Sequence, residues 1–155
     1  MLLIKEGRFY CKGVSFTLPE GFLLNTRPDI ECEDGFMLES ADHSFELMIQ
    51  VDTRDTHSKQ FMDDLMSQNS FSIIRSIAPA ELNGMAGHDV FYSTSREQYY
   101  EAQYDLRDTE EGIVCLAVLI RVTAKEFTAE GALHTPAVQA CLSEVRMEPD
   151  MPDVE

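Results

Sequence analysis

The sequence predicts a single α+β domain, a twisted antiparallel β-sheet of about six to seven strands with α-helices on both faces (an α/β/α sandwich). Two predicted hairpins follow one another over residues 72–95 and 99–122, and successive hairpins favour antiparallel pairing. The segment Ile113–Val122 is almost wholly apolar, so we expect it in the middle of the sheet with both of its faces covered. Amphipathic segments after Ser58 and Thr135 supply the helices.

The chain is expected to open on a weakly paired lead-in at residues 1–7, followed by a strand over Arg8–Leu18 with a β-bulge at Gly13. Apolar side chains recur at every second position of this strand, as is typical of a half-buried strand: Val14, Phe16 and Leu18. Pro19 ends the strand because it has no N–H for the ladder, and Gly21 supplies the turn.

The next segments predict a hairpin and a helix. After a polar, acidic connection at residues 25–35, strands over Phe36–Glu39 and Phe45–Val51 are joined by a loop at residues 40–44. Ser58 is the predicted N-cap of the helix that follows. The apolar stripe of this helix consists of Phe61, Met62, Leu65 and Met66.

Four strands in two hairpins are predicted in the second half of the chain. A strand over residues 72–82 turns at Asn83-Gly84, the strongest hairpin signal in the sequence, into a strand over residues 84–95. The next strand, Tyr99–Leu106, is connected by a turn at Asp108–Gly112 to the apolar central strand.

The chain is predicted to end on a helix and a tail. Thr135 is the expected N-cap of this helix, with Pro136 at its first position. Its apolar face consists of Ala137, Val138, Cys141, Leu142 and Val145. Residues 148–155 are acidic and contain two prolines, so we predict a disordered tail there. One domain is therefore expected over residues 1–147.

Length and charge limit the classes of partner. The 155 residues, of which 44% are hydrophobic, suffice for one domain with its own core. The chain carries 28 acidic residues against 12 basic ones, a formal net charge of −16. Nucleic-acid binding needs a basic face, and an anionic membrane surface would repel this chain, so neither partner is expected. The acidity favours a basic protein or peptide partner.

The cysteines and the hydropathy pattern predict a cytoplasmic protein without metal or cofactor. The four cysteines, Cys11, Cys32, Cys115 and Cys141, lie far apart, so the sequence contains no Cys-x-x-Cys motif or zinc knuckle. Unclustered thiols suit a reducing compartment. No apolar run approaches the ~18 residues of a membrane span. Residues 1–4 are too short for a signal-peptide core, and an extracytoplasmic form with a removed leader is the alternative.

The element order, together with the segment Gly13-Val-Ser-Phe-Thr-Leu-Pro-Glu-Gly-Phe22, resembles the PsbP-like superfamily, which includes the DcrB-like bacterial proteins. The likeness covers residues 8–147 and includes the early hairpin, the helix after Ser58, the passage at residues 82–87 and the terminal helix. It implies a binding or assembly factor in place of an enzyme. No binding residue is carried over from the family. Phe22 stands where relatives usually have tryptophan, and their lipoprotein leader is not seen here.

Local motifs for catalysis or metal binding are absent from the sequence. The four histidines, His43, His57, His88 and His134, lie far apart, and neither Gly-x-Ser-x-Gly nor a glycine-rich phosphate loop occurs. The acidic segment Asp29–Gly35 fails the calcium-loop pattern, because Asp34 and Ser40 stand where glycine and glutamate are required. We therefore assign no catalytic or metal-binding residue. A small hydrolase or transferase with a site assembled from distant residues is the alternative function.

The densest aromatic group offers the candidate binding residues, Tyr92, Tyr99, Tyr100 and Tyr104. Tyr99 lies on the opposite strand face from Tyr100 and Tyr104. One interpretation is that these rings form cross-strand pairs that stabilise the sheet. The other is an apolar groove rimmed by hydroxyl groups, which would bind a peptide or small ligand. The leading hypothesis is a non-catalytic module that binds or assembles with a protein or peptide.

Overall fold

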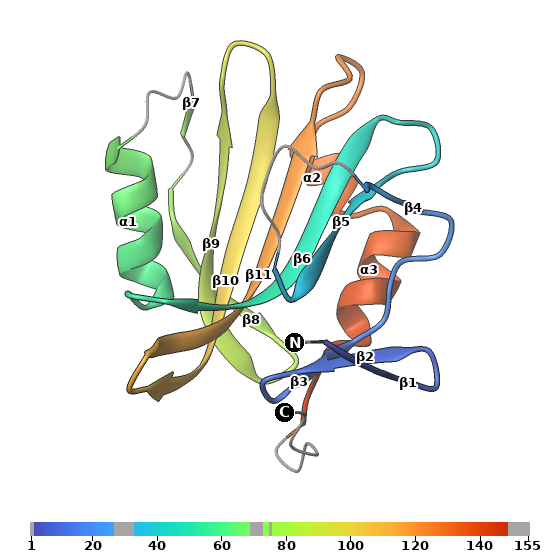
Figure 1. Ribbon diagram of the computed structural model, residues 1–155. Helices are drawn as coiled ribbons and strands as arrows, with labels where there is room; N and C mark the ends of the chain where they lie inside the picture. Colours follow the sequence, from blue (N-terminus) through green and yellow to red (C-terminus); the bar gives the residue numbers. More distant parts are fainter. Residues whose placement is uncertain (1, 27–32, 69–72, 75, 149–155) are drawn as a thin grey trace.

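A large antiparallel sheet forms the centre of the computed structural model, which describes residues 2–26, 33–68, 73–74 and 76–148 (Figure 1). The sheet has eight strands, and β8 pairs with β9 outside the main order. In spatial order the strands are β4 (Leu23–Leu24), β5 (Gly35–Glu39), β6 (Phe45–Arg54), β11 (Gly112–Val122), β10 (Gln98–Thr109), β9 (Met85–Ser93) and β7 (Ile73–Ile74), with β8 (Ala78–Leu82) beside β9. The prediction of an antiparallel sheet in an α+β domain is confirmed.

A second sheet of four strands joins the two ends of the described chain (Figure 1). Its order is β1 (Leu3–Lys5), β2 (Arg8–Cys11), β3 (Val14–Phe16) and β12 (Arg146–Met147). The sequence did not predict this sheet, because β12 has two residues and only its pairing with β3 makes it a strand.

The single opening strand over Arg8–Leu18 was a wrong prediction. Lys12 and Gly13 both have positive φ, 47° and 90°, and form a tight turn between β2 and β3, so Gly13 is not a bulge. A second such turn at Glu6 and Gly7, with φ of 53° and 77°, connects β1 to β2. Two consecutive left-handed residues match the twist of a two-residue hairpin. Residues 1–7 therefore contain a strand, and the opening strands lie outside the large sheet.

The strand predicted over residues 72–82 is divided into β7 and β8, which both pair with β9. Residues 72 and 75 lie outside the described residues. The Asn83-Gly84 turn is confirmed, since Asn83 and Gly84 have φ of 50° and 91° and join β8 to β9.

Three helices are described, α1 (Ser58–Gln68), α2 (Ala129–Leu133) and α3 (Pro136–Ser143). Thr135 is the N-cap residue of α3 and Pro136 its first residue, as predicted. The Thr135 hydroxyl makes no capping bond to α3 and donates instead to the Ala132 carbonyl at 2.9 Å. Ser58 is the first residue of α1, whereas it was predicted to be the N-cap, the position before the first helical residue. The helix α2 was not predicted. Its signal is Thr128, whose side chain accepts from the Gly131 N–H.

The apolar strand β11 lies between β6 and β10, and the prediction that it is central and buried is confirmed. Its even-numbered residues, Val114, Leu116, Val118, Ile120 and Val122, belong to the main core, to which α2 and α3 contribute Ala132, Val138 and Cys141. The helix α1 contributes Met62 to a separate cluster with Val90 and Tyr92 of β9.

The C-terminal end of the described chain is held against the small sheet. The Glu148 N–H donates to the Gly13 carbonyl at 2.7 Å, and its carboxylate accepts from the Ser15 hydroxyl. The rest of the predicted tail, residues 149–155, lies outside the described residues.

Cys11, Cys115 and Cys141 are free and buried, whereas Cys32 lies outside the described residues. Within the described ranges no helix has the length and apolar character needed to span a membrane.

Candidate functional site

The four candidate tyrosines lie in different environments. Tyr100 and Tyr104 are 3% and 5% exposed and belong to the main core, where they pack with apolar side chains. Tyr92 is 8% exposed and lies in the α1 cluster. Tyr99 is the one of the four that is half-buried. Among these four residues Tyr99 therefore offers the most surface for contact with a partner.

The Tyr99 ring is held in place by a stacked partner. Tyr92 and Tyr99 are directly opposite one another on β9 and β10, and their ring centroids are 4.9 Å apart with the planes 10° from parallel. Cross-strand aromatic pairs of this kind stabilise the sheet and restrict the rotamers of both rings. Tyr99 consequently presents a rigid aromatic surface with little conformational entropy left to lose on binding.

Three of these tyrosine hydroxyls donate to carboxylates. Tyr92 donates to Glu101 at 2.7 Å and Tyr99 donates to Glu97 at 2.8 Å. Burial, followed by this interaction with Glu97, raises the pKa of Tyr99 to about 12. The third bond, from Tyr100 to Asp89, is 2.8 Å long. The phenols therefore remain protonated at neutral pH and serve as fixed donors.

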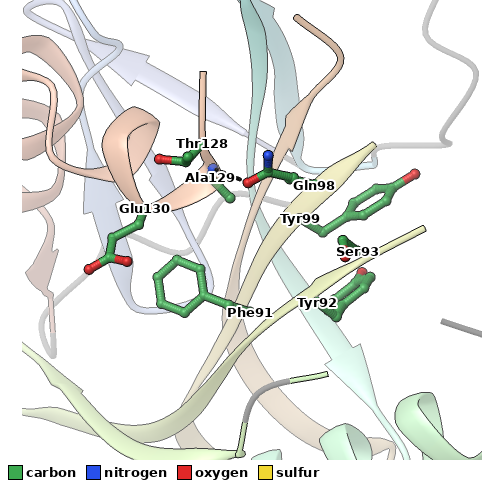
Figure 2. A pocket seen from close by; sticks show the side chains of 8 residues that line it. All are labelled: Phe91, Tyr92, Ser93, Gln98, Tyr99, Thr128, Ala129 and Glu130. Carbon is green, nitrogen blue, oxygen red and sulfur yellow. Dashed lines mark hydrogen bonds between the residues drawn. The ribbon is translucent and has the colours of Figure 1, made fainter. Parts of the chain in front are cut away.

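A pocket of about 300 Å³ lies at the Ser93 end of the β9–β10 pair, beside the start of α2 (Figure 2). Its lining consists of Phe91, Tyr92, Ser93, Gln98, Tyr99, Thr128, Ala129 and Glu130. Successive side chains of a strand point to opposite faces. Figure 2 accordingly shows Phe91, Thr128 and Glu130 on one side of the strands, with the rings of Tyr92 and Tyr99 on the other.

Hydrogen bonds position the wall of the pocket that α2 provides. The Gln98 side chain accepts from the Ala129 N–H at 3.2 Å and donates to the Phe127 carbonyl at 3.3 Å. Thr128 caps α2, because its side-chain oxygen accepts a hydrogen bond from the Gly131 N–H at 2.9 Å. The sequence analysis missed this wall because residues 123–128 carry no periodic pattern, and a single Thr cap signal did not suffice to predict α2.

A Ser–His pair lies at the start of α1. The Ser58 hydroxyl is 2.8 Å from His88 Nδ1, and the Ser58 N–H donates to the Asp105 carboxylate at 3.0 Å. These residues are far apart in sequence and were not predicted to meet. Ser58 is only 1% exposed. A nucleophile must reach its substrate, so this arrangement is a buried hydrogen-bonded contact between α1 and the sheet.

A polar network next to this pair connects β6 to β10. Gln103 is fully buried, and its side-chain carbonyl accepts from Arg54 at 2.8 Å. The Arg54 guanidinium also donates to Asp52 at 3.0 Å and lies 4.0 Å above the Phe61 ring of α1. The amide of Gln103 donates to Asp105 at 2.9 Å. Because every member has a partner, the network orients α1 on the sheet and leaves no buried group open to a ligand.

Three of the four histidines have separate partners in the described part of the chain. His43 contacts Glu39, His57 lies 2.8 Å from Asp108, and His134 lies 2.8 Å from the Glu130 carbonyl. In the part of the chain that the structure describes, no group of three or more His, Cys, Asp or Glu side chains is placed to hold a metal ion. Most of the acidic segment at residues 29–35 lies outside the described residues.

Glu101 lies partly buried beneath Tyr92, and burial raises the pKa of its carboxyl group, against the opposing effect of the Tyr92 hydroxyl. The ionised form therefore destabilises the fold at pH values above the folded-state pKa. This destabilisation is relieved as the pH falls toward the pKa of glutamate in the unfolded state, about 4.3. Below that pH the carboxyl group is protonated in both the folded and the unfolded state. We expect Glu101→Gln to raise the Tm by a few degrees at pH 8, with the difference closing as the pH is lowered.

Thermal melts at a series of pH values measure this difference. Glu81→Gln, at an exposed position of β8, is the matched control for the loss of one negative charge from an acidic chain. Equal effects of the two substitutions across the pH series would contradict the role assigned to burial at Glu101.

Comparisons with known proteins found similarity at the level of structure. No family model matches the chain, and no curated protein matches it. A crystal structure from Bacteroides thetaiotaomicron VPI-5482 is similar to it with a TM-score of 0.47 and 10% sequence identity. The similarity covers 89% of this chain and 46% of that one, so the chain spans about half the length of the protein that it matches.

Proposed function

We propose that this protein is a non-catalytic binding or assembly module for a basic protein or peptide, and that the partner contacts the surface around Tyr99. The observation that carries the proposal is the position of Tyr99, which is stacked on Tyr92, partly open to solvent and adjacent to a pocket of about 300 Å³. Rigid tyrosines at the rim of a pocket are typical of the residues that dominate binding energy in protein interfaces.

Charge supports a basic partner. The chain carries a net charge of −16, and Glu130 lies in the pocket lining. At the tyrosine surface the Glu97 carboxylate lies 3.7 Å from the Arg121 guanidinium, so the attraction comes from the chain as a whole. Long-range attraction would steer a basic partner to this surface and would be screened by salt. The partner affinity is therefore expected to fall as the ionic strength rises.

The alternative is a small hydrolase or transferase, which the Ser58–His88 contact favours. Both residue types occur in nucleophilic catalysis, and Asp105 is close to Ser58. The burial of Ser58 argues against this function, because a substrate would reach its hydroxyl only after α1 had moved away from the sheet.

We also propose a PsbP-like α/β/α arrangement and a cytoplasmic location. Support for the layers comes from the side chains of β9, β10 and β11, which alternate between two faces. The helix α1 packs with Val90 and Tyr92, while α2 and α3 pack with the cluster around Leu116. Support for the compartment comes from three free, buried cysteines.

Tyr99→Ala tests the proposed surface. We expect it to weaken binding of a fluorescently labelled lysine-rich peptide by about tenfold, roughly 1.4 kcal/mol, because the partner loses its aromatic contact. Fluorescence anisotropy at low and at high salt measures the affinity, and a thermal melt verifies the fold. Tyr10→Ala, in β2 of the other sheet, is the matched control. Equal affinities for wild type and Tyr99→Ala would refute the assignment of this surface.

A further inference from the structure

We propose that residues 146–148 form a displaceable strap, which detaches from β3 while the rest of the domain stays folded and thereby uncovers the edge of that strand. The strap consists of β12 and the residue that follows it, Glu148. This inference goes beyond the proposed function, because it concerns the small sheet and does not involve the surface around Tyr99.

The strap is attached to β3 by hydrogen bonds. The two residues of β12 pair with Ser15 and Val14 (Figure 1). The Glu148 N–H donates to the Gly13 carbonyl, and its carboxylate accepts from the Ser15 hydroxyl at 2.7 Å. Both side chains of β12 are exposed, with Met147 at 44%, and neither residue belongs to a hydrophobic cluster of the described chain. Hydrogen bonds that can be exchanged for bonds to water contribute little net stability, so detaching the strap requires far less free energy than unfolding the apolar core.

The chain is fixed immediately before the strap. Val145 is 1% exposed and belongs to the main core, and its carbonyl accepts from the Asn83 side-chain amide at 2.7 Å. The Arg8 guanidinium of β2 donates to the Glu144 carbonyl. None of these contacts involves the strap, so they remain when it detaches. Val145 therefore marks the boundary between the fixed chain and the strap.

Detachment leaves no buried polar group without a partner. The Ser15 hydroxyl accepts from Arg8 Nε at 2.8 Å and donates to Glu148. When Glu148 leaves, the bond from Arg8 is retained and the hydroxyl meets the water that replaces the strap. The large penalty for a buried donor without an acceptor is therefore avoided.

The strap covers a strand edge that would otherwise present free backbone groups. The strand β3 pairs with β2 on one side and with β12 on the other. An uncovered strand edge pairs readily with another extended chain. The strap consequently controls whether the β3 edge is available for such pairing.

Native-state hydrogen exchange of the full chain tests the strap. The protection factor of the Glu148 amide is compared with that of the Val118 amide, in the centre of β11 with a paired strand on each side. We expect the Glu148 amide to be protected at least about a hundredfold less, because local opening requires less free energy than global unfolding. Equal protection of the two amides would overturn the proposal.

Glu148→Gln distinguishes opening of the strap from unfolding of the domain. A neutral amide oxygen accepts the Ser15 bond less strongly than a carboxylate does, so we expect the protection factor at position 148 to fall about fivefold. The protection factor of Val118 and the Tm should stay as in wild type. Glu126→Gln removes an exposed charge outside the strap and is the matched control, which should change neither protection factor. An equal fall at positions 148 and 118 would show that the strap opens only with the domain.

Ser15→Cys measures the uncovering of β3. Ser15 and the native Cys115 are both completely buried, and Cys115 lies in the central strand β11. Each thiol's rate of labelling by iodoacetamide is divided by its own rate in the urea-unfolded protein, and mass spectrometry of peptides assigns the sites. We expect the introduced thiol to react at least about tenfold faster than Cys115 on this scale, because the strap uncovers it without global unfolding. Equal relative rates would refute the opening of the β3 edge.

Discussion

Leu116→Ala is expected to lower the free energy of unfolding by about 2–5 kcal/mol. Leu116 is completely buried at the middle of β11, where its direct neighbours across the two ladders are Tyr104 of β10 and Val51 of β6. The substitution removes apolar contacts and leaves a cavity that a sheet paired on both sides cannot close by moving one strand. Of the substitutions considered, this one has the largest expected effect.

Urea denaturation followed by circular dichroism measures this loss. Leu23→Ala is the matched control, because Leu23 is 51% exposed on the edge strand β4 and the same atoms are removed without a cavity. Its free energy of unfolding should change by less than about 0.5 kcal/mol. An unfolding curve of Leu116→Ala that overlays the wild-type curve would show that β11 does not occupy the centre of the sheet.

Asn83→Asp is expected to destabilise the protein by about 2–4 kcal/mol, although aspartate tolerates the same positive φ in the turn. The Asn83 side-chain amide donates to the carbonyls of Leu142 and Val145 at 3.0 and 2.7 Å, and lies 3.4 Å from that of Ser143. These bonds tie the β8–β9 turn to the end of α3 and to Val145, which follows its C-cap. A carboxylate has no donor and would place a negative charge against these oxygen atoms.

Asn83→Gly separates the turn from the contact with α3. Glycine keeps the left-handed backbone conformation and removes the side chain, which leaves the carbonyls to water, so we expect a loss of about 1 kcal/mol. Chemical denaturation of both variants gives the comparison. Greater stability of Asn83→Asp than of Asn83→Gly would show that the contact with α3 contributes nothing.

The sequence predicted those elements whose signal is local. The strands β6 and β10, the continuous apolar run of β11 and the Asn83-Gly84 turn each have a signal among neighbouring residues, and all are confirmed. Local signals failed where two structures share one pattern. A glycine within a strand is compatible with a bulge or a turn, and the left-handed pair Lys12-Gly13 forms a turn because β2 and β3 pair with each other.

The candidate site was predicted only in part, because strand alternation distinguishes two faces without indicating what covers each. The alternation correctly placed Tyr99 and Tyr100 on opposite faces, and the packing of α2 and α3 against the core then buried Tyr100. The pocket also required Phe91 and Glu130, which come from segments that only the tertiary structure brings together.

The sequence by itself determined that this chain forms an antiparallel α+β domain around one apolar strand, since hydrophobic periodicity and turn residues act over a few positions. It also determined the strong acidity of the chain, a formal net charge of −16. Tertiary structure alone decided that β12 completes the small sheet, that Asn83 holds the end of α3, and that Tyr99 is the half-buried one of the four candidate tyrosines. These outcomes depend on contacts between segments distant in sequence, where burial and hydrogen-bond satisfaction select one arrangement among many that the local pattern allows.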